Sequence, residues 1–83
     1  MIGSRLEKFH LGAWVEIIGE LLEISSDEYS IYLKIDNKVL SFLKESIEAK
    51  YLQQILDDSV IGRKIAVLRT DISEKPLFIR LVD

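Results

Sequence analysis

The alternation of apolar and polar positions predicts a long first strand over residues 14–24. One face of this segment carries small or apolar side chains at every second position, namely Val15, Ile17, Gly19 and Leu21. A glycine within a run of bulky residues is typical of a bulge or a tight bend. Such a bend would let one strand pair along both edges and serve both halves of a small barrel. We therefore expect the remaining strands to assemble around residues 14–24.

Two further strands are predicted to form a hairpin. Residues 31–36 alternate with a period of two, which is typical of a strand with one buried face. The apolar positions of this segment are Ile31, Leu33 and Ile35. Residues 36–38 suit a tight turn, because Asp and Asn side chains bond nearby backbone groups and tolerate left-handed dihedrals. The third strand, residues 39–43, is expected to point Leu40 and Phe42 inward.

The hydrophobic period changes from two to a helical spacing in the second half of the chain. Ser46 can cap a helix, which we expect to end near Asp58. Its apolar stripe consists of Ile47, Tyr51, Leu52, Ile55 and Leu56. Asp57 and Asp58 have the unfavourable sign for the carboxyl end of a helix. Two more strands are predicted, one from Ile65 and one after Pro76, whose missing N–H is tolerated where a strand opens.

These elements predict an all-β fold, a small β-barrel with one helix. The order is strand, strand, strand, helix, strand, strand, in one domain with a leader over residues 1–12 and a barrel over residues 13–83. The leader is expected to form one helical turn across residues 4–10, with Leu6 and Phe9 facing the barrel. Closure into a five-stranded Greek-key barrel, plugged by the helix, would remove the exposed sheet edges.

Composition excludes several classes of function. The chain has no cysteine and one histidine, so we expect no disulfide, no metal site and no cofactor. The single histidine, His10, lies in the predicted leader and suggests no nucleophile and base pair, so the chain is not expected to be an enzyme or to take a small-molecule substrate. No apolar run approaches the length of a membrane span. We expect a protein of the cytoplasm, or of the nucleus in a eukaryotic cell, without membrane contact.

Charge is unevenly distributed along the chain. The formal net charge is −3, which argues against sequence-independent binding of polyanions through clustered bases. Residues 45–61 are acidic, whereas residues 62–83 contain more bases than acids. This distribution is consistent with a polarised binding surface, and equally with chance in a small charged domain.

The spacing of these strands resembles that of the OB-fold family over nearly the whole chain. The pattern consists of Val15-x-Ile17-x-Gly19-x-Leu21, Ile31-x-Leu33-x-Ile35-Asp36, and Gly62 before the fourth strand. About a quarter of the chain is also similar to the smallest subunit of replication protein A and its telomeric relatives. That similarity consists of Leu6-x-x-Phe9, Gly12, Val15, Ile18-Gly19, Leu22-Glu23 and Ile24. It implies work on single-stranded DNA, in replication, repair or telomere maintenance, alongside larger partners.

OB-fold barrels bind single strands on the outer face of the second and third strands and on the flanking loops. Tyr32 and Lys34 lie two residues apart on the outward face of residues 31–36, so a stacking ring would lie beside a phosphate contact. The bases that could contact phosphates further along the chain are Arg69, Lys75 and Arg80. The predicted ligand is single-stranded DNA or RNA. The alternative is that Tyr32 only covers a neighbouring strand and the bases are solvated charges.

A second function remains open, in which the chain is an interaction subunit with little nucleic-acid binding of its own. Large apolar residues also fall on the predicted outer face of residues 14–24, namely Trp14, Ile18, Leu22 and Ile24. An apolar strip of this kind is unusual on a monomer. It would bind a larger protein or a second copy of the chain, although a lone tryptophan is also a frequent core residue.

Overall fold

The computed structural model describes residues 7–8 and 11–82 of the chain. In chain order its elements are β1 (Glu7–Lys8), β2 (Glu16–Ser26), β3 (Ser30–Ile35), β4 (Lys38–Leu43), α1 (Ile47–Ile55), the short 3-10 helix η1 (Asp58–Val60), β5 (Lys64–Arg69) and β6 (Leu77–Leu81). The predicted order of three strands, one helix and two strands is confirmed for β2 to β6. The small all-β class is confirmed with it.

The two described residues of the predicted helical turn, Glu7 and Lys8, form a strand. Glu7–Lys8 pair in parallel with Lys38 and Val39 at the edge of β4, so the prediction of a helical turn is wrong at these positions. The edge of β4 offers hydrogen bonds that no local sequence pattern reveals. Leu6, Phe9 and His10 lie outside the described residues.

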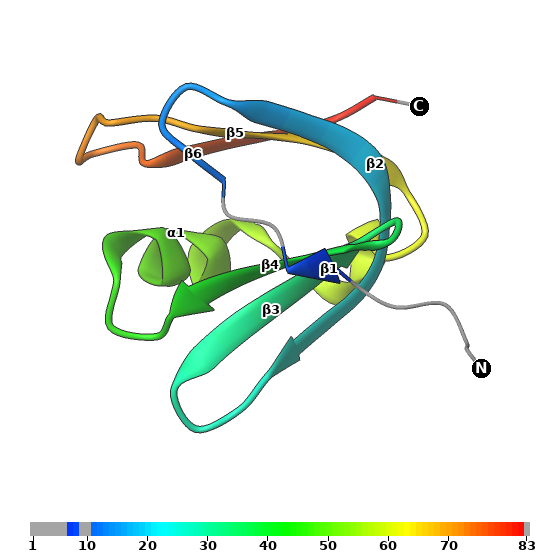
Figure 1. Cartoon of the computed structure of the whole chain (residues 1–83), viewed down its shortest axis with the longest axis horizontal. Helices are drawn as coiled ribbons and strands as arrows, with labels where there is room; N and C mark the ends of the chain where they lie inside the picture. Colours follow the sequence, from blue (N-terminus) through cyan, green and yellow to red (C-terminus); the bar gives the residue numbers. More distant parts are fainter. Residues whose placement is uncertain (1–6, 9–10, 83) are drawn as a thin grey trace.

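β2 is the strand that joins the two halves of the sheet. Its first part, Glu16–Glu20, pairs antiparallel with β5, and its second part, Leu21–Ser26, pairs antiparallel with β3. The sheet order is therefore β1-β4-β3-β2-β5-β6. Figure 1 shows β2 arching between β5 and β6 on one side and β3 and β4 on the other. The predicted pairing of this strand along both edges is confirmed.

A β-bulge in β2 reverses which face its later residues occupy. Leu21 pairs with Ile35, and the register then shifts before Glu23 pairs with Lys34. The extra residue sends every following side chain to the opposite face. Ile24, which the unbroken alternation places on the outer face, instead packs against the core. Its predicted place in an outer apolar strip is therefore wrong.

The start of β2 also differs from the prediction. Trp14 lies in a turn with a φ of 63°, and its backbone N–H donates to the carbonyl of Arg69 at 2.6 Å. Val15, predicted to face inward, is exposed next to this turn. The strand begins only at Glu16, so the inward alternation starts at Ile17.

Gly19 is required by a close approach between two strands. The predicted bend of β2 is present, but the bulge lies after Leu21 rather than at Gly19. A Cβ atom at position 19 would lie 2.8 Å from Cγ2 of Ile35 and would also overlap the Asp36 carboxylate. That carboxylate accepts the N–H of Glu20 at 3.0 Å. Absence of a side chain at Gly19 therefore lets the β3–β4 turn dock on β2.

The helix α1 lies between β4 and β6, two described strands of the curled sheet that do not pair with each other. No pairing among the described residues joins β4 to β6, and α1 contacts both strands. In Figure 1 α1 lies in the mouth of the curl, opposite β2. The largest fully buried side chains are Leu21, Leu33, Ile35, Leu40, Leu52, Ile65, Val67 and Leu77. Phe42 is also buried, so the predicted inward face of β4 is confirmed.

The helix α1 is shorter than predicted. Asp57, predicted at its carboxyl end, instead lies at the start of the next helix, η1. Ser46 accepts the N–H of Ala49 at 3.1 Å as the predicted N-cap, but α1 ends at Ile55 rather than near Asp58. Asp57 caps the separate helix η1, where its carboxylate accepts the N–H of Ser59 at 2.9 Å. An acidic residue there lies at a favourable amino-terminal cap.

Candidate nucleic-acid interface

The outer face of β3 carries Tyr32 and Lys34. Both side chains are half-buried, while the alternating positions Ile31, Leu33 and Ile35 are buried in the core. The predicted alternation of this strand is therefore confirmed, and neither Tyr32 nor Lys34 fills the interior.

The hydroxyl of Tyr32 is fixed by the loop between β2 and β3. It donates to Oδ2 of Asp27 at 2.6 Å, and Oδ1 of the same carboxylate accepts the N–H groups of Tyr29 and Ser30 at 2.8 Å each. Asp27 therefore ties the loop to the outer face of β3. A ring held at its hydroxyl loses less conformational freedom on stacking with a ligand.

Small side chains flank Tyr32 on both neighbouring strands. Ser25 of β2 and Ser41 of β4 are its register partners, and both are exposed. Directly opposite residues on one face of a sheet are the nearest side-chain neighbours. Because both register partners are serines, neither of them covers the ring.

Lys34 lies one step along the same face, beside Glu23 of β2 and Val39 of β4. A lysine two residues from an aromatic ring can contact a phosphate while a base stacks on the ring. Glu23 opposes this contact, since its carboxylate repels a phosphate. The face therefore offers one ring and one partly offset cation.

The hydrogen bond between Asp27 and Tyr32 shifts the pKa of both side chains. The hydroxyl of Tyr32, followed by the backbone N–H groups of Tyr29 and Ser30, lowers the pKa of Asp27 below its ordinary 3.8. Asp27 in turn raises the pKa of Tyr32 above its ordinary 10.0. The stabilising contribution of Asp27 is thus present above pH 3.8 and lost as the pH falls through the lowered pKa. The stabilising contribution of Tyr32 is fully present below pH 10.0. It is lost as the pH rises through the raised pKa of Tyr32.

Removing the Asp27 carboxylate, which accepts the hydrogen bond of the Tyr32 hydroxyl, should make Tyr32 easier to ionise. In Asp27→Ala, we expect the pKa of Tyr32 to fall towards 10.0, because the phenol loses the bond that favours its neutral form. The ring signals of Tyr32 followed by NMR through an alkaline titration measure this shift. Glu28→Ala, which removes a neighbouring acid without a bond to Tyr32, is the matched control. An unchanged titration of Tyr32 in Asp27→Ala would contradict the assignment.

Arg69 is occupied by contacts within the chain. One guanidinium nitrogen lies 3.1 Å from Oε2 of Glu48, and the other donates to the carbonyl of Leu11 at 2.9 Å. The pair joins the first turn of α1 to the end of β5 and is largely shielded from solvent. Arg69 therefore positions α1, and its guanidinium is already engaged by Glu48 and by the carbonyl of Leu11.

Lys75 and Arg80 lie with β6, apart from Tyr32. Nζ of Lys75 is 4.9 Å from the ring centre of Phe78, and Arg80 makes an exposed 3.8 Å ion pair with Glu16. Exposed pairs of this length contribute little, so both bases remain able to bind another anion. In the sheet, β2 and β5 separate β6 from β3, so the five predicted residues do not form one site.

Two exposed aromatic residues were not predicted. Tyr29 is 70% exposed at the tip of the β2–β3 loop, and Phe78 is 39% exposed on β6. The first follows a polar turn cluster, and the second alternates with inward Leu77 and Ile79. Both signals were present in the sequence. Tyr29 belongs to the loop that Asp27 joins to Tyr32, whereas Phe78 belongs to the group with Lys75.

Three of the four residues of the predicted apolar strip are exposed. Trp14, Ile18 and Leu22 are 54%, 49% and 40% exposed, whereas Ile24 packs against the core. Ile18 pairs with Ala66 of β5, which in turn pairs with Arg80. Ile18 therefore lies in register with Arg80 across Ala66 of the intervening strand β5.

Within residues 7–8 and 11–82, no group of three or more potential metal-ligating side chains comes together. The same part of the chain has no helix with the length and apolar character that crossing a bilayer requires. A scan of protein-family models and a search of curated proteins found no match to the sequence.

Proposed function

We propose that this chain is an OB-fold module that binds single-stranded nucleic acid on the outer face of β3. The observation that carries the proposal is the juxtaposition of Tyr32 and Lys34 on that face, with serines on either side of the ring. Bases stack on exposed aromatic rings, and a nearby cation contacts the phosphates. The role is binding rather than catalysis.

The arrangement of the elements supports the OB-fold part of the proposal. Five antiparallel strands curl around one helix between β4 and β5, and the bent β2 serves both halves of the sheet. In the proposed barrel, β4 and β6 approach each other next to α1, which contacts both strands. The resemblance to small subunits of replication protein A and of telomeric complexes extends the proposal to single-stranded DNA and a larger protein partner. The protein would then act in the cytoplasm or nucleus.

The charge of the face sets the expected strength of binding. Lys34 faces Glu23, and the whole chain carries a net charge of −3. Affinity should therefore depend more on stacking than on phosphate neutralisation. Because few counterions are released, the affinity should fall only moderately with salt, with a slope of log affinity against log salt of about −0.7 to −1.4 for one or two phosphate contacts to a single strand.

Fluorescence anisotropy with labelled single-stranded DNA, single-stranded RNA and duplex DNA, each at low and moderate salt, tests this function. We expect single strands to bind in preference to duplex, because a paired base cannot stack on Tyr32. Equal affinity for duplex would contradict the stacking mechanism. No binding to any of the three would contradict the proposed function.

A second candidate function is self-association through the outer side of β2 and β6. The exposure of Trp14, Ile18 and Phe78 favours it, since such patches on soluble proteins often mark interfaces. Glu16 and Arg80 border this surface with opposite charges. In a two-fold dimer each could pair with its counterpart on the other copy. This interface would leave the outer face of β3 free.

Ile18→Glu tests the second candidate. We expect the oligomer to dissociate while the monomer stays folded, because Ile18 points away from the core and a charge at the interface loses solvation. Light scattering measures the mass and circular dichroism the fold. The adjacent Ile17→Glu is the control, and it should unfold the protein, because Ile17 packs against the core. A parent protein that is monomeric at all concentrations would rule out self-association.

A further inference from the structure

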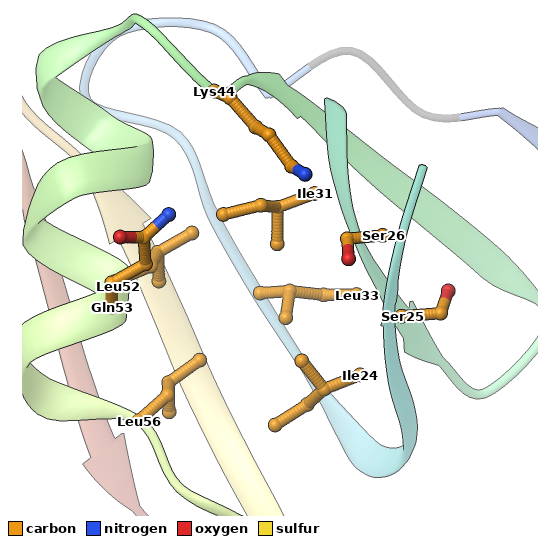
Figure 2. A pocket seen from close by; sticks show the side chains of 9 residues that line it. All are labelled: Ile24, Ser25, Ser26, Ile31, Leu33, Lys44, Leu52, Gln53 and Leu56. Atoms are coloured by element: carbon orange, nitrogen blue, oxygen red, sulfur yellow. The ribbon is translucent and has the colours of Figure 1, made fainter. Parts of the chain in front are cut away.

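A cavity of about 380 Å³ lies between α1 and the concave side of the sheet. The apolar residues that line it in the described part of the chain are all aliphatic, namely Ile24, Ile31, Leu33, Leu52 and Leu56. Figure 2 shows the residues of α1 facing those of β2 and β3 across it. Its volume lies at the lower end of the range for small-molecule pockets, which is about 300 to 1,000 Å³.

The cavity is polar at one end and apolar at the other. In Figure 2 Lys44 lies at one end, Gln53 of α1 and Ser26 of β2 lie on opposite sides nearer to that end, and Ile24 and Leu56 lie at the other end. An ammonium, an amide and a hydroxyl can all donate hydrogen bonds to an anionic group. This layout matches a ligand with a polar head and an apolar tail.

Of the described residues that line the cavity, Lys44 is the one with a charged side chain. Asp27 lies near enough that the Lys44 charge adds a small part to the lowering of the pKa of Asp27, after the hydrogen bonds of Tyr32, Tyr29 and Ser30. The carboxylate of Asp27 already accepts bonds from Tyr32 and from two backbone N–H groups. Among the described residues, no hydrogen bond or ion pair engages the Lys44 ammonium, so its donors are open to a ligand that carries one negative charge.

We propose that this cavity binds a free aliphatic carboxylate of short or medium chain length. The carboxylate would lie beside Lys44, Gln53 and Ser26, and the tail would run between β3 and α1 towards Leu56. One cation matches one carboxylate, and walls without an aromatic ring match an alkyl chain. The volume suits a single chain rather than a phospholipid or a protein helix. This proposal does not rest on nucleic-acid binding, because the cavity lies on the concave side of β3 and Tyr32 on the outer side.

The first test is a chain-length series of hexanoate, octanoate and decanoate, followed through the methyl NMR signals of Leu33, Leu52 and Leu56. Affinity should rise about fourfold for each added methylene until the cavity is full, and then stop rising. Saturable shifts at these methyl groups with such a plateau would support the site. Absence of saturable shifts, or an affinity that rises without a plateau as in adsorption to the surface, would overturn it.

The second test varies the head group and the cation. Octanoate should bind more tightly than octanol or octylammonium. Lys44→Gln should lower the affinity for octanoate by about two- to fivefold and leave the affinity for octanol unchanged. Lys50→Gln, on the exposed side of α1 and outside the cavity lining, is the matched control and should bind octanoate like the parent. Equal affinity for the three head groups, or an equal loss in both variants, would contradict the role of Lys44.

Discussion

Replacing Tyr32 with alanine is expected to weaken binding of single-stranded DNA by about 1 to 3 kcal/mol, or about five- to 150-fold. The ring provides the stacking surface of the outer face of β3, and the flanking Ser25 and Ser41 cannot replace it. Fluorescence anisotropy of a labelled oligonucleotide measures the loss. Circular dichroism should show a folded protein, since Tyr32 is half-buried and outside the core cluster.

Tyr32→Phe separates stacking from the structural role of the hydroxyl. Phenylalanine keeps the ring and removes the bond to Asp27, so this variant should bind DNA nearly as well as the parent. Equal losses in both variants would mean that the bond to Asp27, rather than the ring, supports binding. Parental affinity in Tyr32→Ala would show that the ligand binds elsewhere.

Gly19→Ala is expected to lower the free energy of unfolding by about 1 to 3 kcal/mol, the usual cost of overpacking a tight site. The added methyl group would overlap the Asp36 carboxylate and lie 2.8 Å from Cγ2 of Ile35. To relieve this overlap, the β3–β4 turn would have to move away from β2. That movement would disturb the hydrogen bond from the Glu20 N–H to the Asp36 carboxylate. Urea denaturation at equilibrium measures the change.

Gly12→Ala is the matched control. A Cβ atom there would lie 3.7 Å from Cγ2 of Val15, an ordinary contact. This variant should change the free energy of unfolding by no more than about 1 kcal/mol, and the loss of unfolded-state freedom favours a gain. Equal destabilisation by both substitutions would contradict a specific requirement for glycine at position 19.

Local periodicity predicts most of the fold because each element buries one face. The alternation of residues 31–36 and the helical spacing after Ser46 follow directly from burial against a common core. The bulge at Leu22 has no such signal, because this residue is neither glycine nor polar. The pattern therefore predicts Ile24 on the wrong face, even though the strand itself is correctly located.

The candidate site is less predictable, because its residues depend on contacts between distant segments. Arg69 looks like a free base at the end of a strand, yet Glu48 on α1 and the Leu11 carbonyl engage it. Lys75 and Arg80 lie with β6, but β5 and β2 lie between β6 and β3 in the sheet and separate these bases from Tyr32. The orientation of Tyr32 follows from parity alone, whereas its bond to Asp27 depends on how the intervening loop folds.

The location of the binding face is tested most directly by NMR titration of the labelled protein with a short single-stranded oligothymidylate. We expect saturable shifts in the ring of Tyr32 and the backbone amides of Lys34 and Ser41, which lose amplitude as salt is raised. Shifts confined to Phe78 and the neighbouring bases of β6, or no saturable shift at all, would contradict a nucleic-acid interface on β3.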